Sequence, residues 1–471
     1  MLERREQTIV APATLKAEMA LGIVRLSGKD ALSIVSKVFR PKNKQLKDFT
    51  KALSHHCYFG EIIFEQKIID EVVASVFLNP HSFTGEDIVE ISHHGSPYIQ
   101  DKIIQAMLSS GARLAERGEF SERAFLNGKI NLSQAEAIAD IIACRNDYTH
   151  SLAIKQLRGA YTEAIKELRD KFLKIASLLE LEIDFSEEHE IFVDRKELQQ
   201  QLSQAENMLQ ELLNSFEQGN AFKQGIPIAI VGEPNSGKST LMNALVKEDR
   251  SIVSSIKGTT RDTIEEVITL NGMDYRFIDT AGIREGKDEI EIQGIQRSFQ
   301  AIDKAKIILL IQDITEVYDS KDISKTIELL NKNEQELLKD IDGKYVIKIL
   351  NKIDSININK KSLATLKKEN YIIISALKKE GISDIVEAIT TKFNLEDFNN
   401  KVIISNHRHY EVMHKALQEI ILAKEINETG FSSDIMAENI RQASEYLGQI
   451  TGEITTTEIL TNIFSNFCIG K

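Results

Sequence analysis

The sequence has few of the residues that would suit a secreted or membrane protein. It contains three cysteines, no tryptophan and six prolines in 471 residues. Cys57, Cys144 and Cys468 are odd in number and far apart, so they indicate neither a disulfide framework nor a metal site. No apolar run reaches membrane-spanning length, and Lys16 and Glu18 interrupt the N-terminal apolar segment, which makes a poor signal peptide. We therefore expect a cytoplasmic protein with no membrane partner.

The chain also lacks an excess of positive charge. Its 58 basic and 71 acidic side chains give a formal net charge of −13. Indiscriminate nucleic-acid binding needs a positive field, so this charge argues against it, although a local basic patch remains possible. The 42% hydrophobic content suits a globular protein, and the length predicts roughly two to four domains.

The first third of the chain changes character near Ser133. Residues 1–125 mix β-rich runs such as GIVRLSG (22–28) and DIVEISHH (87–94) with a helical pattern, which favours an α/β domain. From Ser133 onward the pattern is helical, and Ser133 and Glu136 form a predicted capping box.

The helical pattern ends where strands and helices begin to alternate. Gly219 is the predicted stop of an amphipathic helix. Between 226 and 392, apolar runs such as IPIAIV, EEVITL and KIILLI are typical of parallel strands buried on both faces. The chain is helical again after about 400; one helical domain with an inserted α/β domain explains this order, and so do two separate helical domains. The apolar stripe before Gly219 consists of Leu198, Leu202, Ala205, Leu209, Leu212 and Phe216.

The segment VGEPNSGKST (231–240) fits the phosphate-binding pattern G-x4-G-K-[ST], between a predicted strand and a predicted helix. Gly232 and Gly237 allow backbone amides to wrap the phosphates. Lys238 is expected to neutralise the β- and γ-phosphate oxygens, and Ser239 to bind Mg²⁺.

Further motifs follow in order at predicted strand ends. Asp279 in DTAG can reach the Mg²⁺ shell, and the amide of Gly282 can contact the γ-phosphate. Asp354 in NKID offers its carboxylate to the two adjacent N–H donors of guanine, which adenine lacks, and SAL (375–377) closes over the base. We therefore predict a GTPase domain. Its predicted GTP contacts are Asn235, Ser236, Gly237, Lys238, Ser239, Thr240, Ser254, Ser255, Ile256, Lys257, Gly258, Thr259, Thr260, Asp279, Thr280, Ala281, Gly282, Asn351, Lys352, Asp354, Ser375 and Ala376.

The switch segments of this domain pose one problem. In SSIKGTTRD (254–262) a threonine should contact the γ-phosphate and Mg²⁺; Thr260 is the first candidate and Thr259 the second. Ile283 follows DTAG, where Ras-like GTPases have the glutamine that orients the attacking water. Because isoleucine forms no side-chain hydrogen bonds, another group must supply that part of the catalysis.

Four further motifs accompany the GTPase pattern: SFTGEDIVEISHHG (82–95), GEFSERAFLNGKINLSQAEAIADII (118–142), GEITTTEIL (452–460) and the terminal FCIGK (467–471). Together with GTTRD and DTAGIRE they resemble the MnmE family of tRNA-modification GTPases, also called TrmE, over essentially the full length. The resemblance implies a multidomain α/β fold. Its parts are an N-terminal α/β folate-binding and dimerisation domain (1–125), a helical domain in two segments (126–220 and 396–471), and an inserted P-loop GTPase domain with a doubly wound, mainly parallel sheet (221–395).

The resemblance also implies the reaction and its partners. The chain would form a homodimer and join an FAD-dependent partner, MnmG, in a heterotetramer or larger complex. The complex would add an aminomethyl or carboxymethylaminomethyl group to C5 of the wobble uridine of certain tRNAs. The one-carbon donor would be 5-formyl- or 5,10-methylene-tetrahydrofolate.

In this family a K⁺ ion takes the place of an arginine finger between the two GTPase domains of the dimer, which answers the question that Ile283 raises. A cation there offsets charge that develops on the phosphates. Ser254 stands where the family usually has threonine. Glu291 matches the glutamate that helps to orient the attacking water, and Arg261 and Arg284 match switch-region arginines. The matching K⁺ ligands are Asn235, Ser254, Ile256 and Thr259.

The resemblance implies a second site, for the one-carbon unit. Cys468 in FCIGK matches a cysteine needed for modification and not for GTP hydrolysis. Residues 11–21, APATLKAEMAL, depart from the glycine-rich loop usual in the family, and their bulk could alter access of the folate. Cationic side chains suit the carboxylates of a folate, and a glutamate suits pterin N–H donors. The family positions that contact folate are Arg25, Glu90, Lys129 and Lys471.

Two other interpretations stay open. The GTPase core alone would suit a regulatory or ribosome-assembly GTPase without chemistry of its own, although such a protein has no evident need for SFTGED or for the terminal cysteine. The altered 11–21 segment would also suit a protein that has lost folate binding and kept GTP hydrolysis.

Overall fold

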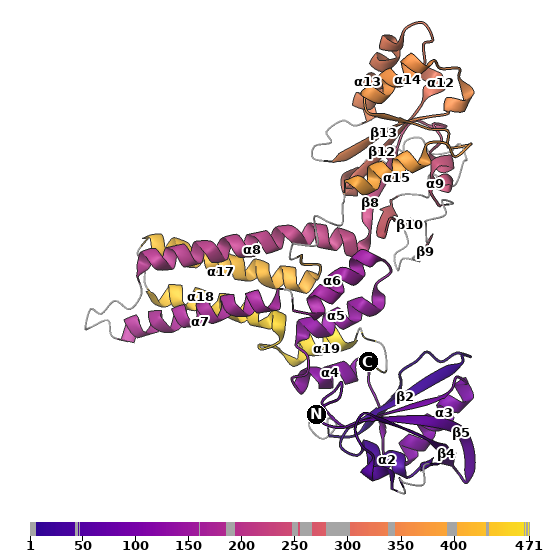
Figure 1. The fold of residues 1–471 in the computed structure, drawn as a ribbon. Helices are drawn as coiled ribbons and strands as arrows, with labels where there is room; N and C mark the ends of the chain where they lie inside the picture. Colours follow the sequence, from indigo (N-terminus) through magenta and orange to yellow (C-terminus); the bar gives the residue numbers. More distant parts are fainter. Residues whose placement is uncertain are drawn as a thin grey trace. The chain divides into compact units, whose positions relative to one another are not determined.

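The computed structural model of the chain forms two compact units (Figure 1). The first consists of Met1–Ala143, Ala153–Ser203 and Lys415–Lys471, and the second of Cys144–Leu152 and Gln204–His414. The structure describes residues 6–42, 46, 48–159, 161–184, 194–246, 253–254, 266–278, 302–337, 344–392, 403–429, 433–465, 467 and 470.

The first unit holds a seven-stranded sheet in the order β3-β4-β5-β6-β2-β1-β7. Neighbouring strands are antiparallel, except that β1 and β7 are parallel. The predicted strand runs GIVRLSG and DIVEISHH are confirmed as β2 and β6. The strands are β1 (Ile9–Pro12), β2 (Leu21–Ser27), β3 (Phe39–Pro41), β4 (His56–Phe64), β5 (Lys67–Phe77), β6 (Ile88–His94) and β7 (Arg113–Leu114).

The two faces of this sheet have different surroundings. One face, with Val24 of β2, is buried against the helices α2 (Ala31–Ser36) and α3 (Pro97–Ser109). Side chains alternate between the faces of a strand, so Arg25 and Glu90 lie on the opposite face, directly across from each other on β2 and β6. Two of the predicted folate contacts therefore share one face.

Helices make up the rest of the first unit. The long helices α7 and α18 pack side by side, and α19 packs on α4 through a cluster that includes Leu132, Leu460 and Phe464. Gly118 permits this packing, since a Cβ at that position would lie 2.5 Å from the carbonyl oxygen of Phe464. These helices are α4 (Glu119–Leu126), α5 (Leu132–Ala143), α7 (Thr162–Asp184), α18 (Ser433–Thr451) and α19 (Thr457–Ser465).

The capping box predicted from Ser133 and Glu136 is wrong. The N–H of Gln134 donates to Asn131 Oδ1 (2.8 Å), and the N–H of Asn131 donates to Gln134 Oε1 (2.9 Å). Asparagine is as good an N-cap as serine, so the same reciprocal motif forms two residues earlier. Ser133 is instead buried in the first turn of α5, where its carbonyl accepts from Gln156 Nε2 (3.0 Å).

The second unit holds a sheet in the order β14-β13-β12-β8-β11-β10-β9. From β14 to β11 all neighbours are parallel, as predicted. The run EEVITL was wrongly assigned to the parallel set, because it forms β10 antiparallel to β11. The turn between them, Asn271 and Gly272 with φ of 49° and 79°, is the two-residue type that joins a hairpin. The strands are β8 (Ile226–Val231), β9 (Val253–Ser254), β10 (Glu266–Leu270), β11 (Met273–Phe277), β12 (Ile307–Asp313), β13 (Tyr345–Asn351) and β14 (Tyr371–Ile373).

Apolar side chains on both faces of this sheet are buried, as a doubly wound fold requires. Leu241 of α9 and Ile385 of α15 pack against one face, and Ala229 and Leu310 belong to a cluster on the other. Among the described helices of both units, no segment has the length and apolar character needed to cross a bilayer. The helices of this unit are α9 (Lys238–Val246), α12 (Ile314–Val317), α13 (Ile323–Leu337), α14 (Lys360–Lys368) and α15 (Ile382–Thr391).

The long helices α8 (Arg195–Gln224) and α17 (His407–Thr429) each belong partly to both units. The predicted apolar stripe of α8 is confirmed, since all six of its side chains are buried. The predicted stop at Gly219 is wrong, because the helix continues to Gln224 and Gly225 follows it with a φ of +87°. At Gly219 a Cβ would lie 2.1 Å from the carbonyl oxygen of Ile404, so this glycine serves close packing instead.

A segment outside the predicted GTPase range completes the core of the second unit. Tyr148, near the start of α6 (Asp147–Leu157), is 4% exposed and belongs to the same buried cluster as Tyr275 of β11. Its ring centroid lies 4.2 Å from that of Phe222. The sequence pattern does not distinguish this segment from the helices before it, so its place in this core was not predicted.

We expect Tyr148→Ala to destabilise the second unit by about 3–5 kcal/mol, because it removes a buried aromatic side chain. Hydrogen exchange of the β8 and β11 amides in increasing urea measures this change. Tyr148→Phe is the matched control and should cost no more than about 1.5 kcal/mol. Equal protection of those amides in the alanine variant and the unsubstituted protein would contradict the assignment of Tyr148 to this core.

Candidate functional site

The predicted phosphate loop connects β8 to α9. Asn235 and Gly237 have φ of +62° and +102°, in the left-handed region. A Cβ at Gly232 would lie 2.2 Å from the carbonyl oxygen of Ile311, and one at Gly237 would lie 2.1 Å from Asn351 Nδ2. Both glycines are therefore required by the packing of the loop, and the loop has the backbone shape that phosphate cradles need.

Lys238 begins α9, directly after this loop. Its Nζ donates to the carbonyl oxygens of Gly232 (2.8 Å) and Glu233 (2.7 Å). Burial lowers the pKa of Lys238, and the charge of Glu233 acts in the opposite direction. A nearby phosphate would favour the charged form more strongly than carbonyls do, so this ammonium group suits an anionic ligand. Ser239 and Thr240 follow it on the same turn and are exposed.

Asn351 joins the phosphate loop to the segment predicted to close over the base. Its Nδ2 donates to the carbonyl of Ser236 (2.9 Å), and its Oδ1 accepts from the N–H of Ala376 (3.0 Å). Asn351 is 2% exposed, so both bonds form away from water. The sequence identified Asn351 as part of a motif but did not predict this connection between three separate segments.

The carboxylate predicted to bind guanine is held in place by the next segment. Asp354 Oδ1 accepts a hydrogen bond from Ser375 Oγ (2.6 Å). This bond lowers the pKa of Asp354 below its ordinary value, so the group is ionised at neutral pH and can accept from N–H donors. Lys352 forms an ion pair with Asp313 at the end of β12, a partner that sequence reasoning missed.

The structure thus brings together Asn235, Ser236, Gly237, Lys238, Asn351, Lys352, Asp354, Ser375 and Ala376 in one unit. Ser254 lies in β9, for which only the backbone is described. The remaining predicted contacts of the switch segments lie outside the described residues. They are Ser255, Ile256, Lys257, Gly258, Thr259, Thr260, Arg261, Asp279, Thr280, Ala281, Gly282, Arg284 and Glu291.

A second candidate site lies on the face of the first unit's sheet opposite α2 and α3. Arg25 Nε and Nη2 each contact Glu90 Oε1 at 2.7 Å, and Arg25 Nη1 donates to the carbonyl of Gly470 (3.3 Å). Gly470 has a φ of +92°, and a Cβ there would lie 2.1 Å from the carbonyl oxygen of Pro12. The C-terminal glycine is therefore packed against the first strands of the chain.

The other predicted folate residues are less completely described. Lys129 Nζ donates to the carbonyl of Pro80 (2.9 Å), on the segment between β5 and β6. No contact between Lys129 and the Arg25–Glu90 pair is described. Cys468 and Lys471 lie outside the described residues.

The segment that departs from the family's glycine-rich loop is fixed by several contacts. Thr14 Oγ1 accepts from the N–H of Ile23 (3.0 Å), and Lys16 pairs with Asp101 (2.7 Å). The N–H of Met19 donates to the carbonyl of Gly95 (2.9 Å). This segment therefore has a defined path beside β2.

Comparison with known proteins identifies the family of the chain. A family model described as the MnmE helical domain matches residues 132–468, and one described as the GTP-binding protein TrmE N-terminus matches residues 8–129. A protein of Flavobacterium johnsoniae named tRNA modification GTPase MnmE is 45% identical over 99% of this chain and 99% of its own. A protein of the same name from Parabacteroides distasonis is 43% identical over 98% of this chain and 100% of its own length. Another, from Cytophaga hutchinsonii, is 39% identical over 98% of this chain and 98% of its own length.

A solved structure of a single-residue variant of Aquifex aeolicus Era, bound to GDP and AlF4⁻, is also similar in sequence. It is 27% identical over 41% of this chain and 66% of its own, with a TM-score of 0.26. A TM-score this low carries no structural argument, so the family assignment rests on the family models and the full-length relatives.

We expect Asp354→Asn to weaken GTP binding by about 2–3 kcal/mol, the size of a lost charge-assisted hydrogen bond. The same change should favour xanthosine triphosphate, because xanthine has a carbonyl where guanine has an amine, and the new amide can donate to it. Dissociation constants for the two nucleotides measure the shift. Asn351→Ala is the control and should weaken both nucleotides alike; unchanged base preference in Asp354→Asn would exclude the proposed guanine contact.

Proposed function

Because the chain belongs to the MnmE family of tRNA-modification GTPases, we propose that it couples GTP hydrolysis to modification of the wobble uridine of certain tRNAs. With the FAD-dependent partner MnmG it would add an aminomethyl or carboxymethylaminomethyl group to C5 of that uridine. The single observation that carries this proposal is the hydrogen bond from Arg25 Nη1 to Gly470 O (3.3 Å). It brings Gly470, which follows Cys468 by two residues in sequence, to the face that carries two predicted folate contacts.

In the GTP site, the phosphate loop and the base-binding segments would divide the work. Lys238 would exchange its present carbonyl partners for the β- and γ-phosphate oxygens. Ser239 and Thr260 would hold Mg²⁺, which supplies charge to the triphosphate when bound. Asp354, already ionised and oriented by Ser375, would accept from the guanine N–H donors.

For the catalysis that Ile283 cannot provide, we propose a K⁺ site made by Asn235, Ser254, Ile256 and Thr259. A K⁺ ion there would supply positive charge beside the phosphates. Asn235 lies in the phosphate loop, and its side-chain amide oxygen is a neutral acceptor, which suits a monovalent cation. Glu291 would help to orient the attacking water, and Arg261 and Arg284 would act from the switch segments.

In the one-carbon site, the described geometry supports a division of roles. Both contacts from Arg25 reach Glu90 Oε1, so Oε2 remains to accept from a pterin N–H, since no donor to it is described. Lys129 and Lys471 would pair with the glutamate carboxylates of a reduced folate. Cys468 stands two residues before Gly470 in sequence and would lie within reach of the one-carbon unit.

We further propose three domains. The first is 1–125, the GTPase domain is 221–395, and the segments 126–220 and 396–471 together form one helical domain. The first domain would form a homodimer and hold the reduced folate, and the GTPase domains of two chains would meet across the K⁺ sites. The homodimer would bind MnmG in a heterotetramer or larger complex in the cytoplasm.

We expect GTP hydrolysis to be at least about tenfold faster in KCl than in NaCl at equal ionic strength, because a cation that fits the site would remove about 1.4 kcal/mol or more from the barrier. The hydrolysis rate, measured with Mg²⁺ in both salts, tests this. Asn235→Ala should lose most of the difference between the salts. Equal rates for the unsubstituted protein would remove the potassium mechanism.

We expect tRNA from cells that lack this gene to have lost the C5 modification of the wobble uridine. Nucleoside analysis of that tRNA tests the function directly, and unchanged wobble uridines would favour the regulatory or ribosome-assembly GTPase. Cys468→Ser should fail to restore the modification while its GTP hydrolysis stays within about twofold of the unsubstituted rate. A fully modifying Cys468→Ser variant would exclude a chemical role for this cysteine.

A further inference from the structure

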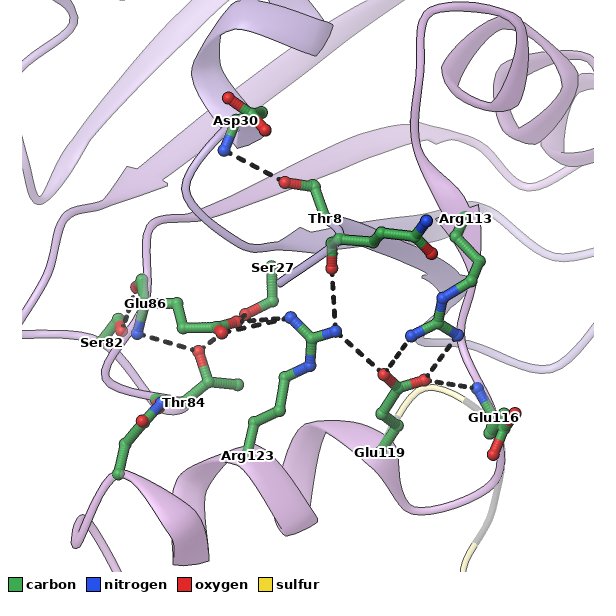
Figure 2. Close-up of polar contacts among 12 residues, drawn as sticks. Thr8, Ser27, Asp30, Ser82, Thr84, Glu86, Arg113, Glu116, Glu119 and Arg123 are labelled. Carbon is green, nitrogen blue, oxygen red and sulfur yellow. Dashed lines mark hydrogen bonds and ion pairs between the residues drawn. The ribbon is translucent and has the colours of Figure 1, made fainter. Parts of the chain in front are cut away.

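A buried cluster of ion pairs lies between α4 and the segment 79–87, which joins β5 to β6 (Figure 2). Its centre is Arg123, which is 5% exposed. Arg123 Nη1 contacts both carboxylate oxygens of Glu86 (3.0 and 3.1 Å), and Nη2 donates to Glu119 Oε1 (2.9 Å) and to the carbonyl of Gln7 (2.9 Å). One guanidinium group therefore connects α4, the 79–87 segment and the residues before β1.

The Glu86 side of the cluster fixes the 79–87 segment to β2. Ser27 Oγ donates to Glu86 Oε2 (2.7 Å) and also lies 2.7 Å from Thr84 Oγ1. Ser27 and Thr84 are completely buried. Asn127 Nδ2, at the end of α4, donates to the carbonyl of Thr84 (2.7 Å). The 79–87 segment is therefore held both by β2 and by the C-terminal end of α4.

The Glu119 side of the cluster holds the first turn of α4. Arg113 Nη1 donates to Glu119 Oε2 (3.0 Å), and the N–H of Glu116 donates to the same oxygen (2.9 Å). Burial opposes ionisation of Glu119, but hydrogen bonds from Arg113, Glu116 and Arg123 outweigh it and lower the pKa of the carboxyl. These contacts fix the first turn of α4 and do not reach the 79–87 segment.

The position of this cluster relates it to the proposed folate contacts. Ser27 follows Arg25 by two residues on β2, and Glu90 follows the 79–87 segment on β6. Lys129 follows α4, and its Nζ donates to Pro80 O in the same segment. The space beside Gly85 is also occupied by Lys129, since a Cβ at Gly85 would lie 3.2 Å from Lys129 Cγ. The three proposed contacts that the structure describes are thus on or next to elements that Arg123 and Glu86 connect.

We infer that Arg123 and Glu86 are positioning residues of the one-carbon site, which set the place of Lys129 relative to the Arg25–Glu90 pair. The inference rests on the proposed folate function. It explains why the GEFSER and SFTGED motifs place polar side chains at buried positions, namely Glu119, Arg123 and Thr84. An apolar contact would hold the two segments together, whereas a guanidinium that contacts both oxygens of a carboxylate also fixes their relative orientation.

The chain offers a matched pair of variants for the test. Glu86→Gln and Glu119→Gln each remove one carboxylate charge that pairs with the Arg123 guanidinium. Glu86 belongs to the 79–87 segment, whereas Glu119 belongs to α4. We expect Glu86→Gln to raise the dissociation constant for 5-formyl-tetrahydrofolate about tenfold, which corresponds to about 1.4 kcal/mol. Glu119→Gln should leave it within about twofold, although both variants lower the melting temperature.

Titration of the folate and thermal unfolding of the full chain decide between positioning and general stability. A folate affinity that falls in both variants in proportion to the melting temperature would overturn the inference. Glu86→Asp, which restores the charge, should recover part of the affinity; no recovery would count against the positioning role.

A separate measurement covers the case in which the unsubstituted protein binds no folate, which would end the folate proposal. Hydrogen exchange of the 79–87 amides reports the position of the segment without any ligand. Faster exchange in Glu86→Gln than in Glu119→Gln supports the positioning role of the cluster, and equal exchange in the two variants overturns it.

Discussion

The hydrogen bond from Arg25 to Gly470 O joins residues 445 positions apart in the sequence. Its formation requires that the last helix of the chain reach the first sheet, and two close contacts allow this. Phe464 of α19 lies against Gly118 at the start of α4, and Gly470 lies against Pro12 at the end of β1. Neither contact would accommodate a side chain at the glycine. The one-carbon site that we propose therefore needs both the N-terminal strands and the C-terminal segment in their folded positions. A fragment that contains only one of these two segments would lack part of the site.

The GTP site depends on a similar long-range constraint, carried by one buried amide. Asn351 connects the phosphate loop to Ala376, so one side chain links the loop that would bind phosphates to the segment that would cover the base. The same side chain lies against Gly237, which explains why a glycine is needed there apart from its backbone conformation. Phosphate binding and base recognition thus share a structural partner.

The sequence predicted this fold well where the signal is local. The apolar runs of β8 and β12 and the phosphate loop are confirmed because burial on both faces and glycine spacing leave clear patterns. The errors arose where alternatives are similar in sequence. Asn131 replaced Ser133 as the cap because either side chain can accept the same bond. Gly219 was taken as a helix stop because sequence does not reveal that Ile404 packs against it. The Arg123 cluster and the bridging role of Asn351 depend on contacts between distant segments, which no periodicity reports. The predicted switch residues and Cys468 stay predictions.

Tyr148 has a consequence for how the second unit could be separated from the rest of the chain. A fragment limited to residues 221–395 would lack the ring that packs against Phe222 in the buried cluster that includes Tyr275. That fragment would expose apolar surface at the site, which favours self-association or loss of rigidity. A peptide spanning 144–157 could then bind the vacated surface in trans, because it carries the missing side chain on its own helix. The core of the second unit therefore includes a residue from outside the proposed 221–395 range.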